Sequence, residues 1–138
     1  NIVGVKEANG NLAENARTAA LCGDDLALYS GEDSLTLPIL SLGGKGVVST
    51  SANVIPKEMD EICRNYFQGN FSRSRAVFLK YLDVMNALFL DVNPIPVKAA
   101  LKMIGFDCGG CRLPLTELNA ENTQKLRAVL QGHGLLAG

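Results

Sequence analysis

Three short segments rich in Val, Ile and Leu recur about twenty residues apart along the first half of the chain, and stretches of helical length separate them. They are IVGVK at 2–6, LALYS at 26–30 and GVVST at 46–50, each bounded by Gly, Asn or Asp. A strand, helix, strand, helix, strand order requires parallel strands joined by right-handed crossovers. The sequence therefore predicts three βα units of an α/β fold.

Helix start and stop signals mark out the segments between and after these strands. Asn11 is suited to cap a helix that ends near Gly23. Asp33 or Ser34 is suited to cap a second helix that continues through Leu42. Further helices are expected at 56–69, 71–93 and 96–104, followed by a last helix that Asn119 caps and that ends before Gly132. The chain is predicted to begin as βα units and to end as helices alone.

Composition and charge narrow the classes of partner. The chain is 47% hydrophobic and 20% charged, as is typical of a globular domain. The 13 basic and 14 acidic residues include no basic run, so no nucleic acid is expected as a partner. No apolar segment approaches the roughly 20 residues of a membrane span, so no membrane is expected and a cytoplasmic location is the default. In that compartment the four cysteines are expected to be reduced thiols.

Lys6 closes the first strand segment, at the end where α/β folds place ligands. Apolar neighbours such as Ile2 would desolvate its ammonium and leave more of the neutral amine, which attacks ketones and aldehydes to form a Schiff base. Alternatively, Lys6 pairs with Glu7 or reaches water at the rim of the sheet. Spacing alone favours the second interpretation, whereas Gly4, which leaves space beside the strand, favours the first.

Longer motifs reach beyond these local signals. GVKEANGN, LYSGEDS, LGGKGVVSTSANVIP, NPIPVKAALKMIG and RLPLTEL occur in this order and closely resemble the dihydrodipicolinate synthase family over essentially the whole chain. GVKEA alone indicates only the wider pyruvate-aldolase superfamily, which includes N-acetylneuraminate lyase. The resemblance implies the C-terminal portion of a (β/α)8 TIM barrel over residues 1–70, whose strands would be the sixth to eighth, and a C-terminal helical domain over residues 71–138.

The resemblance also implies an activity and a set of site residues. The family's members are lyases that condense pyruvate with aspartate semialdehyde in lysine and diaminopimelate biosynthesis, without a metal or cofactor, as homo-oligomers (dimer or tetramer). Lys6 would form the Schiff base with pyruvate, and Gly31 and Val48 would line the pyruvate pocket, largely through backbone groups. We expect Tyr29, by contrast, to pack against a helix, and Lys45 to lie at the opposite end of the sheet.

A whole (β/α)8 barrel takes about 250 residues, so five strands of it have no counterpart here. With them the family's Tyr-Thr-Tyr proton relay and its carboxylate-binding arginine are missing. We therefore expect the chain to be a C-terminal fragment with little or no synthase activity alone. The two unpaired edges of a three-stranded sheet support this interpretation.

Other interpretations stay open. The chain could belong to another pyruvate-dependent aldolase, such as N-acetylneuraminate lyase, or be a non-catalytic module that self-associates through its strand edges and helices. The spacing of Cys108 and Cys111 also suits a dithiol or half of a zinc site, although the only histidine, His133, lies in a Gly-rich tail. Two reduced cysteines in a surface loop are the simpler interpretation, and no metal is expected.

Overall fold

The computed structural model describes residues 1–136, and packing divides them into two compact units. Unit 1 comprises residues 1–49 and 57–80, whereas unit 2 comprises residues 50–56 together with those from Tyr81 onward. None of the helices among the described residues is long and apolar enough to cross a bilayer. The domain boundary expected after residue 70 concerns the whole barrel and stays a prediction.

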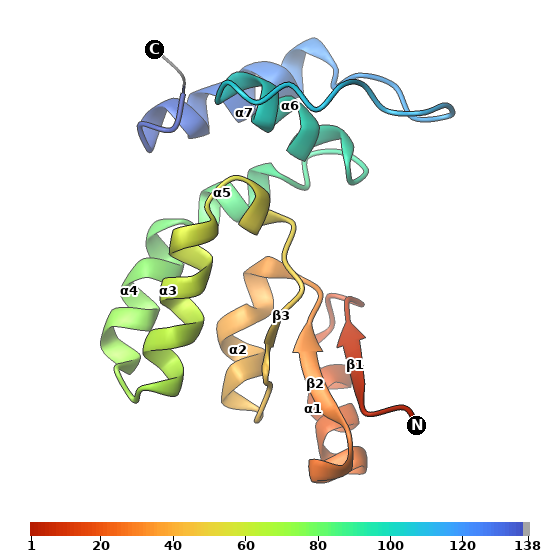
Figure 1. The fold of residues 1–138 in the computed structure, drawn as a ribbon, viewed down its shortest axis with the longest axis vertical. Helices are drawn as coiled ribbons and strands as arrows, with labels where there is room; N and C mark the ends of the chain where they lie inside the picture. Colours follow the sequence, from red (N-terminus) through yellow and green to blue (C-terminus); the bar gives the residue numbers. More distant parts are fainter. Residues whose placement is uncertain (137–138) are drawn as a thin grey trace. The chain divides into compact units, whose positions relative to one another are not determined.

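Unit 1 is built on a three-stranded parallel sheet in the order β1-β2-β3 (Figure 1). The strands are β1 (Gly4–Glu7), β2 (Ala27–Ser30) and β3 (Gly46–Val47). The predicted parallel βα units are thus confirmed. The third strand is shorter than the 46–50 expected, although the amide of Val48 continues the ladder by donating to the carbonyl of Ser30 at 2.8 Å.

The first helices of the βα units begin at or near the residues that polar start signals indicate. α1 (Leu12–Cys22) begins after Asn11, whose side-chain oxygen accepts from the amide of Ala13 at 3.0 Å, as predicted. The second helix starts later than expected, because a 3-10 turn over Asp33–Leu35 precedes α2 (Thr36–Ser41). Each of these helices follows the carboxyl end of a strand. The loops between strand and helix lie beside Lys6.

One face of the sheet is covered and the other is open. Leu28 and Ser30 are buried on the face where α1 and α2 pack, whereas Tyr29, between them in sequence, is 36% exposed. Successive strand residues point to opposite faces, so Tyr29 stands on the open face. The expectation that Tyr29 packs against a helix is wrong, because both covering helices lie behind the sheet.

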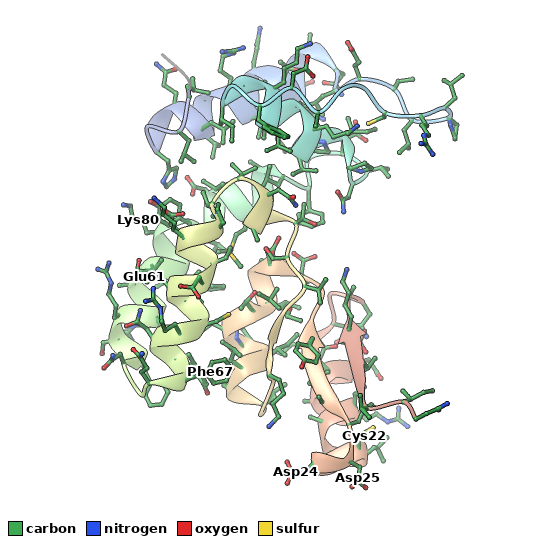
Figure 2. The ribbon with its side chains drawn as sticks, in the orientation of Figure 1. Cys22, Asp24, Asp25, Glu61, Phe67 and Lys80 are labelled. Atoms are coloured by element: carbon green, nitrogen blue, oxygen red, sulfur yellow. The ribbon has the colours of Figure 1, made fainter. Side chains whose placement is uncertain are left out.

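α3 (Pro56–Phe67) and α4 (Phe71–Lys80) form a helical hairpin in unit 1 (Figure 1). The buried hydroxyl of Ser74 donates to the carbonyl of Ile62 at 2.7 Å. At the surface, Arg73 Nε donates to Glu61 Oε1 at 2.6 Å, and Figure 2 labels Glu61 on α3. A buried hydrogen bond and an exposed ion pair thus join the same two helices.

Ser74→Ala should lower the free energy of unfolding by about 1 kcal/mol, because it removes the donor to a buried helix carbonyl. Ser72→Ala, an exposed change on the same helix, is the matched control and should change stability by less than about 0.5 kcal/mol. Urea unfolding followed by circular dichroism measures both. Equal stability of the two variants would contradict this account of the hairpin.

The single helix predicted over 71–93 is wrong. The chain turns at Tyr81 and continues as α5 (Leu82–Ala87). α4 buries Val77 and Phe78 in unit 1, whereas α5 buries Val84 and Met85 in unit 2. No Gly or Pro lies at the turn, so the break follows from tertiary packing, which helical periodicity does not report.

Unit 2 adds α6 (Ile95–Met103) and α7 (Ala120–Gly132). The predicted cap is confirmed, since the Asn119 side chain accepts from the amide of Asn122 at 2.8 Å. His133 follows α7, and its Nε2 lies 2.9 Å from Oδ1 of Asp83 at the start of α5 while its ring stacks on Tyr81. His133 thus links two helices of unit 2, a role that its position in a Gly-rich tail did not indicate.

Candidate active site at the carboxyl ends of the strands

The register of the sheet places Lys6 beside Tyr29. Lys6 of β1 pairs with Tyr29 of β2, and Tyr29 pairs with Gly46 of β3. Paired residues on neighbouring parallel strands point to the same face. Lys6 therefore stands on the open face of the sheet, near the carboxyl ends that the arrowheads mark in Figure 1.

The side chain of Lys6 runs over Gly31, the residue that follows β2. A Cβ placed on Gly31 would lie 2.8 Å from Lys6 Cε and 3.0 Å from Lys6 Cγ. It would also lie 2.6 Å from the Cβ of Ala8. Only a residue without a side chain leaves room for the lysine stem here. The structure thus brings together two of the three residues predicted for the site.

Val48, the third predicted residue, lies at the carboxyl end of β3. Its side chain is 50% exposed, and alternation from Gly46 places it on the open face. Its amide bonds to the carbonyl of Ser30, next to Gly31 in sequence. Lys6, Gly31 and Val48 therefore lie at the carboxyl ends of three neighbouring strands, and their roles toward a substrate stay predictions.

Hydrogen bonds of the ladder limit what these backbones offer a ligand. The amide of Gly31 donates to the carbonyl of Glu7 at 2.7 Å, and that of Val48 is taken by Ser30. Neither N–H is left for a substrate carboxylate. Donors for a substrate carboxylate therefore come from groups other than these two amides.

The dry surroundings expected for Lys6 are not supplied by this chain. Lys6 is exposed, and Ile2, which was expected to desolvate it, is 80% exposed because it precedes the sheet. The ion pair considered with Glu7 is also not formed among the described residues. The Glu7 carboxylate instead accepts the amide of Asn9 at 3.2 Å. The amine of Lys6 therefore faces open space on the uncovered side of the sheet.

The opposite end of the sheet holds a different set of side chains. Lys45, Cys22 and Asp24 line a hollow of ≈ 180 Å³ at the amino-terminal ends of the strands. Figure 2 shows Cys22 and Asp24 at the end away from the arrowheads. Lys45 therefore lies away from Lys6, as expected, and serves as a matched control for it.

Cys108 and Cys111 lie in an irregular loop of unit 2. Residues 106–112 adopt no helix, strand or turn, and Cys108 and Cys111 are free, half-buried thiols. Lys98 Nζ donates to the carbonyls of Cys108 and Gly110, at 3.3 Å and 2.5 Å. Across residues 1–136, no three His, Cys, Asp or Glu side chains gather closely enough to hold a metal ion. The arrangement agrees with a loop that carries two thiols.

Cys63 on α3 should be slow to alkylate. Burial raises the pKa of its thiol, and the Asp60 carboxylate raises the pKa further, so less thiolate is present at a given pH. With iodoacetamide at neutral pH, Cys63 should react several-fold more slowly in the folded protein than in urea-unfolded protein, by peptide mapping. Equal rates in the two states would contradict the burial of this thiol.

The sequence of the chain is similar to proteins of one family. The sequence model of the Dihydrodipicolinate synthetase family matches residues 1–133. The 4-hydroxy-tetrahydrodipicolinate synthase of Clostridium perfringens (strain SM101) is 49% identical over 136 residues, which are 99% of this chain and 47% of that protein. The chain therefore spans about half the length of the curated relatives it matches.

Solved structures show the same coverage. The crystal structure of dihydrodipicolinate synthase from Aquifex aeolicus is 42% identical and superposes with a TM-score of 0.93 over 100% of this chain and 47% of that one. The chloride-inhibited enzyme from Acinetobacter baumannii, solved in complex with pyruvate, is 34% identical with a TM-score of 0.92 over 99% of this chain and 47% of that one. The predicted α/β fold, a partial (β/α)8 barrel with C-terminal helices, is confirmed.

Proposed function

The chain belongs to the Dihydrodipicolinate synthetase family, and from this premise we propose that it supplies the Schiff-base lysine, Lys6, of a 4-hydroxy-tetrahydrodipicolinate synthase. The reaction is the condensation of pyruvate with aspartate semialdehyde in lysine and diaminopimelate biosynthesis. The observation that carries the proposal is the stem of Lys6 lying over Gly31 at the carboxyl ends of parallel strands, where such folds bind ligands. A relative's complex with pyruvate supports the substrate class.

The proposed chemistry starts at the Lys6 amine. Its lone pair attacks the C2 carbonyl of pyruvate, water leaves, and an imine joins Nζ to C2. The imine withdraws electrons, so a proton leaves the methyl group and an enamine forms. The enamine carbon then attacks the aldehyde of aspartate semialdehyde, the aldehyde oxygen takes up a proton to become a hydroxyl, and the imine to Lys6 is restored. The amino group of the joined aspartate semialdehyde attacks the imine carbon, closes the ring and displaces the Lys6 amine. Because the lysine itself activates the ketone, no metal or cofactor enters these steps.

The rest of the site is proposed to come from strands outside these 138 residues. Parallel sheets are normally covered on both faces, whereas the face that carries Lys6 is open in this chain. The substrate carboxylate also needs donors that Gly31 and Val48 do not offer, and no arginine stands at the three carboxyl ends. We therefore propose that the chain alone has little or no synthase activity, and that the active form is a homo-oligomer of the completed barrel.

The test of this proposal uses a fusion protein, in which the part of the Clostridium perfringens synthase that the match leaves uncovered precedes residues 1–138. The fusion protein and the chain alone are assayed with pyruvate and aspartate semialdehyde, and separately for cleavage of N-acetylneuraminate. The proposal expects synthase activity in the fusion protein only. Cleavage of N-acetylneuraminate without synthase activity would assign the chain to the alternative aldolase.

The open face and the two unpaired strand edges also favour self-association of the chain by itself. Specific interfaces bury about 1,000 Å² or more of accessible surface. Sedimentation at micromolar concentration should show a dimer or larger species. A monomer would remove the self-associating module as an alternative and leave the catalytic proposal untouched.

A further inference from the structure

The ring of Tyr29 lies across the open face of the sheet, between two glycines on the neighbouring strands. A Cβ placed on Gly4 of β1 would lie 3.4 Å from Tyr29 Cε2. A Cβ placed on Gly46 of β3 would lie 3.7 Å from Tyr29 Cδ1 and 3.9 Å from Tyr29 Cε1. Opposite edges of one ring therefore reach both flanking strands, over backbone that carries no side chains.

The backbone, as well as the ring, requires glycine at both positions. A side chain on Gly4 would meet the carbonyl oxygen of Ala27 at 2.9 Å. Gly46 has a φ of 150°, which residues with a side chain rarely adopt. The backbone of the two strands thus fixes the space that the tyrosine ring occupies, and this space does not depend on a flexible neighbouring side chain.

The open face is arranged in two layers along the strands. The register pairs Lys6 with Tyr29 and Tyr29 with Gly46, whereas Gly4 lies two residues before Lys6 on the same face of β1. The Tyr29 ring leans over Gly4, and this ring and Gly4 form the lower layer, on the amino-terminal side of Lys6. Lys6 and Gly31 stand above it, with the lysine stem crossing the glycine. Side chains inside parallel barrels stack in such layers. The ring therefore closes the space beneath the lysine, and Gly31 opens the space beside it.

We infer that Tyr29 is a positioning residue: its ring, seated between Gly4 and Gly46, forms the floor of the Lys6 site and holds the lysine stem over Gly31. The inference rests on the function proposed above and adds a residue to it. A lysine stem has four rotatable bonds, and an open floor would let it fold toward the amino-terminal ends of the strands. The ring blocks those conformers, so more of the amine stands where pyruvate arrives.

The shape of the ring carries this role, and its hydroxyl does not. Among the described residues, the Tyr29 hydroxyl makes no hydrogen bond with Lys6 or with any other group. A phenylalanine would reach the same two glycines with the same ring edges. Tyr29→Phe is therefore the conservative variant that should keep the function, and Tyr29→Ala is the variant that should lose it.

The test is the rate at which borohydride traps pyruvate on Lys6, measured against pyruvate concentration in the fusion protein. Tyr29→Ala should lower the maximal trapping rate at least about tenfold and change the half-saturating pyruvate concentration by less than about twofold, because the lysine and not the ketone is misplaced. Tyr29→Phe should match the parent. Tyr66→Ala on α3 removes a tyrosine whose ring packs on Phe67 and Phe71, and it should also match the parent.

Three results would overturn the inference. They are an unchanged maximal rate in Tyr29→Ala, an equal loss in Tyr29→Phe, which would transfer the role to the hydroxyl, and a loss confined to half-saturation. If thermal unfolding shows that Tyr29→Ala does not fold, Tyr29→Leu decides by the same readout, since leucine fills volume but does not span both glycines. A parent protein that traps no pyruvate on Lys6 would instead contradict the proposed function.

Discussion

Lys6→Ala should abolish the trapping of pyruvate by borohydride in the fusion protein and lower synthase activity by at least about a thousandfold, since the nucleophile of the proposed reaction is gone. In the chain alone, stability should change by less than about 0.5 kcal/mol, because Lys6 is exposed there and its removal leaves no cavity. Mass spectrometry of the reduced protein measures the first effect, and urea unfolding measures the last. Lys6→Arg should be equally inactive, since a guanidinium stays protonated and does not attack a ketone.

The matched control for Lys6 is Lys45→Ala, at the opposite end of the sheet beside Cys22 and Asp24. It removes the same functional group from the same unit and should leave trapping unchanged. The assignment of Lys6 is contradicted if Lys6→Ala still traps pyruvate while Lys45→Ala does not. A loss in both variants with a loss of fold would indicate a structural effect, which the unfolding curves separate.

Gly31→Ala should slow trapping at least about tenfold, because a methyl group at this position displaces the lysine stem. The new Cβ would lie 2.8 Å from Lys6 Cε and 2.6 Å from the Cβ of Ala8, closer than carbon atoms approach without moving. Part of the strain should also appear as a loss of about 1–3 kcal/mol in the free energy of unfolding. Trapping kinetics and urea unfolding, run on the same preparations, measure the two effects.

Gly132→Ala is the control for this change, since a Cβ placed on Gly132 meets no atom within 4 Å. It should trap pyruvate at the parent rate and unfold at the same urea concentration or a slightly higher one, because alanine favours helix over glycine. A Gly31→Ala variant that matched Gly132→Ala in trapping would show that the lysine stem does not depend on the space over Gly31.

Local patterns predicted much of the fold because the interactions behind them are local. Asn11 and Asn119 cap their helices through bonds to amides two or three residues ahead, which sequence spacing encodes directly. The parallel sheet followed from the order of strands and helices. The break at Tyr81 was missed because α4 and α5 bury their apolar faces in different units, and no residue at the turn signals the change.

The sequence predicted three residues of the site. It did not predict which side chains lie next to one another, because that depends on the register of the strands. The motif around Lys6 and the family resemblance indicated Lys6, Gly31 and Val48. That the lysine stem crosses Gly31 depends on how β1 and β2 pair, which strand-length segments do not state. The same register places Tyr29 on the face that carries Lys6, whereas we expected it to pack against a helix. The expected burial of Lys6 failed because the sheet has no cover on that face within this chain.

The most direct test of the central claim is peptide mapping after borohydride reduction of the fusion protein in the presence of pyruvate. The claim predicts one reduced adduct, on the peptide that contains Lys6, and none when pyruvate is omitted. An adduct on another lysine of residues 1–138, or the absence of any adduct in a fusion protein with synthase activity, would contradict it.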